Sequence, residues 1–297
     1  MISLNQDLQE KKKSLVEFEA ITLRVLEYLP VVLSEFKEKS GYKIHSSQIA
    51  GTTKYLRPIN QRLFIYSPED FRSKFNDFRI VIEQLKIKKD DWADREKQLI
   101  DSVLYTIQQS IGAGFDLLAN PNSARKHVGN RFEELMKAIF TEIGIANKRA
   151  ILQIPYNTEE GVKTYYNCEN DLILSPYSKV KSTTTHLDEH EIVVSAKTTS
   201  KDRMGKMFID KILLQRFVKH DQKVIGIFLN DVQRKETNNI SFTLVSGLFM
   251  VYTNFLVEMD GIYYIDPPPN AFKEPFNKYM KPFSELVTKD IWNLLSP

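Results

Sequence analysis

The chain has little of what marks several classes of protein. Its 297 residues include one cysteine, Cys168, which excludes an intrachain disulfide and a cysteine-rich zinc site and fits a reducing cytoplasm. No apolar run approaches the length of about 18 residues that spans a bilayer. Residues 1–18 are polar and charged and lack the apolar centre of a signal peptide. We therefore expect a cytoplasmic protein without a membrane segment.

The composition is that of a folded protein with an ample core. Hydrophobic residues make up 42% of the chain and charged residues 27%, within the globular range. The length suits one large domain or two of ordinary size. The formal net charge of +3 is a weak indication of a polyanionic partner.

Residues 1–118 are predicted to form a mostly helical N-terminal region. Apolar residues recur at helical spacing over 14–39, 67–88 and 90–111, and Gly112 and Gly114 are expected to end the last of these helices. Between the first two, residues 41–67 interleave basic and aromatic side chains. This pattern predicts a solvated loop, with nucleic-acid contact as the alternative. The region is expected to serve DNA contact, dimerisation or regulation.

Residues 119–297 have a different pattern and are predicted to form an α/β domain. A helix is expected over 122–145 and another over 203–220, with a helical tail over 274–295. Strands are expected at 150–156, 167–174, 191–197, 223–230 and, more weakly, 241–252 and 261–266. This order of elements, in which a crossover helix joins a group of strands to a further strand, indicates an α/β fold. The fold expected is a central mixed sheet flanked by helices.

An acid and a lysine fall on two successive predicted strands. Asp171 precedes the apolar run "LIL", and Lys197 ends "EIVVSAK". Metal-dependent hydrolysis of a phosphodiester requires carboxylate oxygens to hold the cation and a positive group to orient water or stabilise charge. The alternative is that the lysine merely extends to solvent, which is the simpler interpretation for either residue taken alone.

In the common version of this geometry a second carboxylate stands two residues before the lysine. Ser195 occupies that position here, so the second carboxylate has to come from elsewhere. Asp210 is the candidate, since the apolar residues around it in "KMFIDKILL" predict burial, and a buried carboxylate must be paired, hydrogen-bonded or metal-bound. The alternative is an ion pair with Lys206, one helical turn earlier. On the preceding helix, Glu133 is a further candidate, and the sequence does not separate it from Glu134.

The triplet Lys201-Asp202-Arg203 has a pattern suited to recognising G·C base pairs. Lysine and arginine donate to guanine O6 and N7 in the major groove, and a carboxylate accepts from cytosine N4. Arg203 and Asp210 are also predicted to share one helix face with Lys206. The alternative is a solvated helix start in which Asp202 favours the positive end of the helix dipole.

Together these residues resemble type II restriction endonucleases of the PD-(D/E)XK fold. "SAKTTSKDR", with the acid in "ENDLIL", resembles the EcoRII/NgoMIV-like group, whose members recognise CCGG, CCNGG or CCWGG cores. The resemblance covers roughly residues 122–217. That group carries its second metal-binding acid on the helix after the lysine, where Asp210 stands. It recognises G·C pairs with a triplet placed as Lys201-Asp202-Arg203 is, although arginine is commoner at the first position.

The preceding helix adds to the resemblance. "SARKHVGNRFEEL" resembles the group's basic segment and its Gly-x-x-Phe-Glu helix, which implies DNA contacts for Arg125 and Lys126 and places Glu133 as the helix acid. Asn170 departs from the proline that usually precedes the strand acid, but that proline is not a metal ligand.

The resemblance implies a Mg²⁺-dependent enzyme that cuts both strands of DNA at a short symmetric G/C-containing site. Asp171 and Asp210 are expected to hold Mg²⁺, Lys197 to orient or activate water, and Glu133 to assist. A homodimer is expected from the symmetry of the DNA. A DNA methyltransferase is expected as a functional rather than physical partner. The alternatives are a repair nuclease or resolvase of the same fold, and a DNA-binding module of this fold that no longer cuts.

Overall fold

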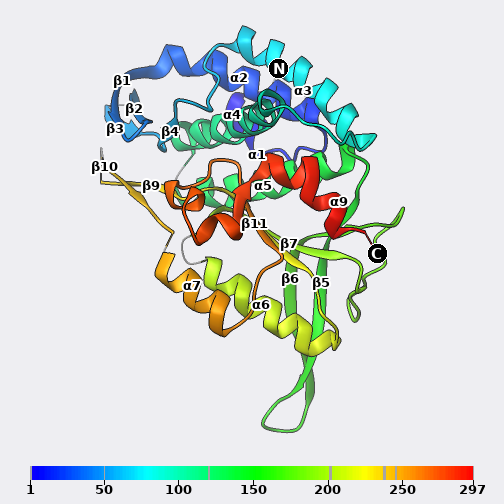
Figure 1. The fold of residues 1–297 in the computed structure, drawn as a ribbon. Coiled ribbons are helices and arrows are strands. Elements are labelled where there is room, and N and C mark those ends of the chain that lie inside the picture. Colours follow the sequence, from blue (N-terminus) through cyan, green and yellow to red (C-terminus); the bar gives the residue numbers. More distant parts are fainter. Residues whose placement is uncertain are drawn as a thin grey trace.

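The computed structural model places a six-stranded mixed sheet at the centre of the molecule, with helices on both faces (Figure 1). The structure describes residues 2–49, 51–119, 121–200, 203–236, 239–244 and 246–296. The strand order is β12-β11-β8-β7-β6-β5, with β5, β6 and β7 antiparallel and β7, β8, β11 and β12 parallel. The bounds are β5 Ala146–Asn157, β6 Lys163–Ser175, β7 Ile192–Thr199, β8 Val224–Asn230, β11 Gly261–Tyr264 and β12 Met280–Pro282.

Side chains of the central strands alternate between two hydrophobic cores. On β6, Leu172 and Leu174 pack into one core and Ile173 into the other. On β7, Val194 joins the first core and Val193 the second. Because successive side chains of a strand point to opposite faces, this alternation shows a sheet covered on both sides.

Different helices cover the two faces of the sheet. Helix α5 (Pro121–Glu142) covers the first core, and α6 (Arg203–Val218) and α7 (Ser246–Phe255) cover the second. Helices α5 and α6 confirm the helices predicted over 122–145 and 203–220. The crossover from β7 through α6 to β8 is the unit that joins parallel neighbours in a sheet.

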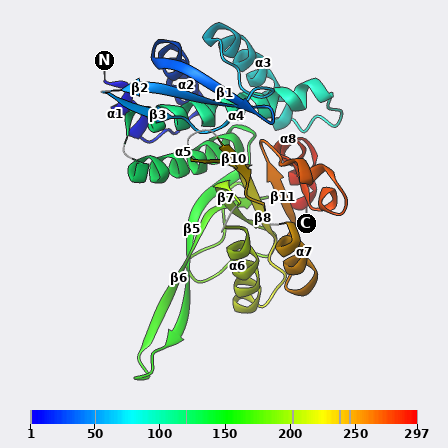
Figure 2. The same ribbon diagram turned by 90° about the vertical axis from the view of Figure 1, so that its left-hand side faces the viewer.

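The antiparallel strands β5 and β6 extend well beyond the sheet as a two-stranded ribbon (Figures 1 and 2). Their pairing runs from Ala146↔Ser175 to Asn157↔Lys163, whereas β6 pairs with β7 only over Leu172–Leu174. The ribbon therefore carries residues of β6 out past the edge of β7.

The N-terminal region is mostly helical, as predicted, but it also contains a four-stranded antiparallel sheet. The helix predicted over 14–39 ends at Val32, and residues 33–39 form the first strand of that sheet. The predicted solvated loop over 41–67 is wrong, because strands occupy much of it. Tyr42 and Ile44 are buried there against Val232 and Ile240 of a distant hairpin, a contact that the local pattern does not show. The bounds are α1 Leu4–Gln9, α2 Leu15–Val32, β1 Leu33–Lys39, β2 Tyr42–Ile49, β3 Thr52–Tyr55, β4 Ile59–Asn60, α3 Pro68–Lys86 and α4 Asp94–Leu118.

Helix α4 does not end at Gly112 and Gly114, as the sequence predicts, but continues to Leu118. These glycines instead allow side chains from other segments to lie close to the helix backbone. A Cβ added at Gly112 would lie 2.1 Å from the Arg57 guanidinium, and one at Gly114 would lie 2.8 Å from Leu8. Packing against neighbours, rather than chain reversal, therefore explains both glycines.

The C-terminal part differs from the prediction at two further places. The tail predicted to be helical over 274–295 contains the strand β12 (Met280–Pro282) between short helical segments. Residues 241–252 were expected to form a weak strand, but only Asn239–Phe242 is extended (β10, paired with β9, Val232–Lys235), and α7 follows. The remaining elements are η1 Pro269–Phe272, η2 Phe276–Lys278, α8 Phe283–Glu285, η3 Leu286–Asp290 and α9 Ile291–Leu294.

The first core crosses the predicted boundary at residue 118. It joins residues of α2 and α4, such as Phe18 and Phe115, to Phe132 of α5 and Phe283 of α8. The two parts of the chain therefore share one hydrophobic core. Among the described residues, no helix is both long and apolar enough to cross a membrane.

Candidate active site

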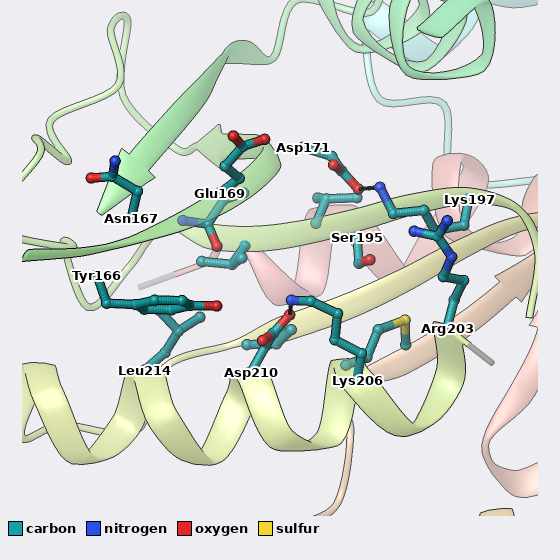
Figure 3. Close-up of a pocket in the computed structure, with 15 residues that line it drawn as sticks. Tyr166, Asn167, Glu169, Asp171, Ser195, Lys197, Arg203, Lys206, Asp210 and Leu214 are labelled. Atoms are coloured by element: carbon teal, nitrogen blue, oxygen red, sulfur yellow. Dashed lines mark hydrogen bonds and ion pairs between the residues drawn. The ribbon is translucent and has the colours of Figure 1, made fainter. Parts of the chain in front are cut away.

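Strands β6 and β7 bring Asp171 and Lys197 together (Figure 3). The pairs Leu172↔Val194 and Leu174↔Ile192 fix the register, so that Asp171 lies beside the carboxyl end of β7. Asp171 Oδ2 lies 2.6 Å from Lys197 Nζ and accepts a hydrogen bond of 2.9 Å from the backbone N–H of Ala196. The buried strands thus hold both groups in a fixed orientation.

Glu133 of α5 completes an acid-lysine-acid arrangement. Its Oε1 lies 3.4 Å from Lys197 Nζ. Burial, and next the nearby charge of Asp171, raises the pKa of Glu133. Glu134 turns away and accepts hydrogen bonds of 2.9 Å from Arg131 and from the backbone N–H of Lys12. Of the two glutamates that the sequence leaves open, the structure brings Glu133 to the lysine.

Helix α6 faces this group across a pocket of about 320 Å³ (Figure 3). Arg203, Lys206 and Asp210 line the pocket from the helix, and Ser195 lines it from β7. Asp171 and Lys197 line the same pocket. The face of α6 that carries Arg203 and Asp210 therefore lines the same pocket as the pair formed by Asp171 and Lys197.

Asp210 is less buried than its apolar neighbours in the sequence predict. Its side chain is 24% exposed, and the adjacent Ile209 is 59% exposed. The buried face of α6 is formed by Met204, Met207, Phe208, Lys211 and Leu214, so Asp210 lies at its border, toward the pocket.

The ion pair that the sequence offered as an alternative is present. Lys206 Nζ lies 2.5 Å from Asp210 Oδ2. Burial lowers the pKa of Lys206, but the hydrogen bond and charge of Asp210 outweigh it, so that this pKa is raised. Asp210 thus both lines the pocket and pairs with a lysine, and its role stays a prediction.

The other residues predicted to contact DNA fall in three places. Lys201 and Asp202 lie outside the described residues. Arg203 is exposed and lines the pocket. Arg125 and Lys126 are exposed on α5 but do not line the pocket, so the structure does not bring them to the acid-lysine group.

Sequence reasoning missed the part of the pocket formed by the ribbon. Tyr166, Asn167 and Glu169 line the pocket from β6, and Glu169 pairs with Arg149 at 2.6 Å. The signal was the two-residue spacing of Asn167, Glu169 and Asp171, which places these three on one face of a strand. Cys168, between them, is buried, and burial, with a smaller contribution from Asp210, raises the pKa of its thiol to about 11.

The chain can be compared with known proteins by sequence and by fold. No protein-family model matches it, and no curated protein matches its sequence. Among solved structures, the type IIP restriction endonuclease Kpn2I superposes with a TM-score of 0.71 at 18% identity, covering 95% of this chain and 91% of that one.

The fold is that of a type II restriction endonuclease. The predicted α/β architecture, with a central mixed sheet flanked by helices, is therefore confirmed. A looser match is the restriction endonuclease PspGI in its complex with substrate DNA. It has a TM-score of 0.42 at 11% identity and covers 76% of this chain and 92% of that one.

Enzymes with this restriction-endonuclease fold are generally dependent on divalent metal, and the donor set here fits such an ion. Asp171 and Asp210 offer carboxylate oxygens, which hard cations prefer. Among the described residues, no group of three His, Cys, Asp or Glu side chains is arranged to hold a metal. Mg²⁺ needs no such cage, because it keeps waters and is held by one or two carboxylates plus substrate phosphate.

Proposed function

We propose that this chain is a type II restriction endonuclease that cuts both strands of DNA, with Mg²⁺, at a short symmetric G/C-containing site. The observation that carries the proposal is the position of Lys197, whose amine lies 2.6 Å from Asp171 and 3.4 Å from Glu133 at the pocket that Asp210 and Arg203 also line. A lysine held between carboxylates at the pocket can stabilise the negative charge that develops in phosphodiester hydrolysis, whereas a surface lysine cannot.

The roles of the side chains follow from their positions. Asp171 and Asp210 would hold Mg²⁺ at the pocket that both line, and the hydrogen bond from the Ala196 N–H fixes the Asp171 carboxylate. When bound, Mg²⁺ supplies positive charge that stabilises the transition state of phosphodiester hydrolysis. Lys197 donates to the attacking water or to a phosphate oxygen, and Glu133 keeps the lysine amine directed into the pocket.

The residues at the start of α6 recognise the DNA sequence. Arg203, with Lys201 and Asp202, contacts the edges of G·C pairs, as the resemblance to the EcoRII/NgoMIV-like group implies. Arg125 and Lys126 on α5 contact phosphates and contribute affinity rather than specificity.

The assembly follows from the symmetry of the substrate. Two strands of opposite polarity require two active sites related by a two-fold axis, so the enzyme acts as a homodimer. It acts in the cytoplasm beside a DNA methyltransferase that protects the host's own sites.

The test is incubation of the protein with a mixture of plasmid DNAs, with Mg²⁺ and with a chelator. Discrete Mg²⁺-dependent fragments whose sequenced ends share one symmetric site are the expected result. Nicks at branched or damaged DNA would indicate a repair nuclease or resolvase, and a gel shift without cleavage would indicate a binding module. The variant Asp171→Asn serves as the control for a contaminating nuclease.

A further inference from the structure

Asp231 is fully buried. It follows the last residue of β8 and precedes β9. A carboxylate removed from water has to be hydrogen-bonded, so its partners show which segments it joins. The backbone N–H of Ser200 donates to its Oδ1 at 3.0 Å, the Thr243 hydroxyl donates to it at 2.9 Å, and the Ser200 hydroxyl donates to it as well.

The Ser200 backbone in turn starts helix α6. Its carbonyl accepts hydrogen bonds from the backbone N–H of Arg203 at 2.7 Å and of Met204 at 2.9 Å. A helix end is fixed by the partners of its first turn. Through Ser200, Asp231 therefore fixes the position from which Arg203 enters the pocket.

A second set of contacts ties the same point to the catalytic strand. Thr199, the last residue of β7, lies with its hydroxyl 3.1 Å from that of Thr243 and pairs with Asn230 of β8. The backbone N–H of Thr243 donates to the Asp231 carbonyl at 2.8 Å. Asp231 thus joins the ends of β7, β8 and β10 at one buried point. The segment that it holds there, Thr199 and Ser200, lies between Lys197 and Arg203 in the sequence.

We propose that Asp231 is a positioning residue for specificity, which sets the geometry of the base-contacting start of α6 relative to the catalytic strand. The proposal rests on the proposed function, because it assumes that Arg203 contacts bases. Asp231 itself touches no DNA, so its loss alters the choice among sequences more than the affinity for DNA in general. Affinity for DNA in general comes from phosphate contacts elsewhere.

The chain offers a matched control in Asp266. This carboxylate is also buried, at 3% exposure, and follows the neighbouring parallel strand β11. It accepts hydrogen bonds of 3.0 Å from the Tyr42 hydroxyl and 2.8 Å from the Asn60 amide, both in the N-terminal region. Its replacement removes a similar buried charge without touching β7 or α6.

The experiment compares Asp231→Asn with Asp266→Asn. The site is first mapped from fragments cut by the unsubstituted protein. Binding is then measured, with Ca²⁺ in place of Mg²⁺, to a duplex carrying that site and to the same duplex with one G·C pair in each half changed to A·T. Asp231→Asn is expected to reduce the ratio of the two affinities about tenfold, the size of one lost base contact. Asp266→Asn is expected to lower the melting temperature and to leave the ratio unchanged.

Each other outcome overturns the proposal. If both variants lose only stability, Asp231 is an ordinary core residue. If Asp231→Asn loses cleavage while the affinity ratio holds, Asp231 supports the catalytic strand and not the choice of sequence. If the unsubstituted protein itself shows no preference among duplexes, the proposed function fails, and this inference fails with it. Ser200→Ala, which removes one donor to Asp231, gives the same test should Asp231→Asn not fold.

Discussion

At the scale of single residues, the site is organised by one lysine amine that lies between two carboxylates. Lys197 Nζ is within 3.4 Å of both Asp171 and Glu133, and all three side chains are at most 25% exposed. Partial burial strengthens such interactions relative to water. The lysine thus compensates the negative charge of the site and points toward the pocket in which the substrate phosphate is expected.

Lys197→Ala is expected to abolish cleavage while leaving specific binding intact. Removing a group that stabilises developing charge lowers the rate about 10²–10³-fold or more. Single-turnover cleavage and a gel-shift titration measure the two properties separately. Lys137→Ala, which removes an exposed lysine of α5 away from the pocket, is the control for net charge. Cleavage by Lys197→Ala at the normal rate would remove the strand pair from the proposed active site.

Asp210 and Lys206 give a second pair of variants. Asp210→Asn is expected to lose cleavage and to weaken metal binding, because it replaces a charged oxygen ligand with a neutral amide of equal size. Lys206→Ala breaks the same ion pair and keeps the carboxylate, so it is expected to retain metal-dependent cleavage.

The comparison distinguishes a metal ligand from a structural partner. An exposed pair at this spacing contributes only ~0.3–0.5 kcal/mol to stability, and Lys206 is 56% exposed. Thermal melts measured beside activity would show equal small effects in both variants if Asp210 served the helix alone.

At the scale of elements, α6 presents two of the proposed site residues along one face. It carries Arg203 at its start and Asp210 two turns later, and both line the pocket opposite β6 and β7. One rigid helix can therefore fix a base contact relative to a metal ligand. Under the proposed function, the start of the helix is a determinant of specificity.

Arg203→Ala is expected to cost ~1–3 kcal/mol of discrimination between cognate and altered duplexes, the value of a good bidentate contact with guanine. Non-specific binding and its salt dependence are expected to change little, because they rest on phosphate contacts. Binding to a cognate and a scrambled duplex at two salt concentrations tests this. Arg216→Ala, at the exposed far end of α6, is the matched control. Equal weakening on both duplexes, with a shallower salt slope, would assign Arg203 to phosphate instead.

At the scale of the whole molecule, buried carboxyl groups join the N-terminal region to the rest. Asp101 of α4 accepts hydrogen bonds from the backbone N–H and hydroxyl of Ser284 in α8, at 3.0 and 2.7 Å. Burial raises the pKa of Asp101 to about 8 from an ordinary value of 3.8. The folded protein therefore retains a proton there that the unfolded chain releases near pH 4.

This difference predicts how stability varies with pH. Between about pH 4 and pH 8 the folded state binds more protons at Asp101 than the unfolded state does, so the stability that this group contributes falls as the pH rises and levels off above about 8. Asp101→Asn removes the titration and leaves other groups in place. The melting temperature of the unsubstituted protein, relative to this variant, is expected to fall by several degrees from pH 5 to pH 8. A constant difference would show that Asp101 ionises at its ordinary pKa.

Much of the α/β part could be predicted from local pattern, because its helices and strands bury continuous apolar runs. Asp171 and Lys197 could also be assigned to successive strands, because each adjoins a buried apolar run. The strand β6 nevertheless begins well before Asp171, at Lys163, so the acid lies inside the strand and not at its end. Glu133 and Glu134 could not be separated, because neighbouring residues of a helix differ in direction and only the packing of α5 on the sheet decides which faces the lysine. The burial of Asp210 was overestimated for the same reason.

What the sequence by itself determined is therefore the fold class and the chemical character of the site, since both depend on residues close together in the chain. The tertiary structure alone decided the features that depend on distant contacts. Tyr42 and Ile44 of the N-terminal sheet are buried against β9 and β10, and Gly112 accommodates Arg57 instead of ending a helix. Asp231 meets Ser200 only because β7 and β8 are parallel neighbours. Such contacts leave no local pattern, because each partner's sequence is compatible with many environments until the chain folds and fixes one of them.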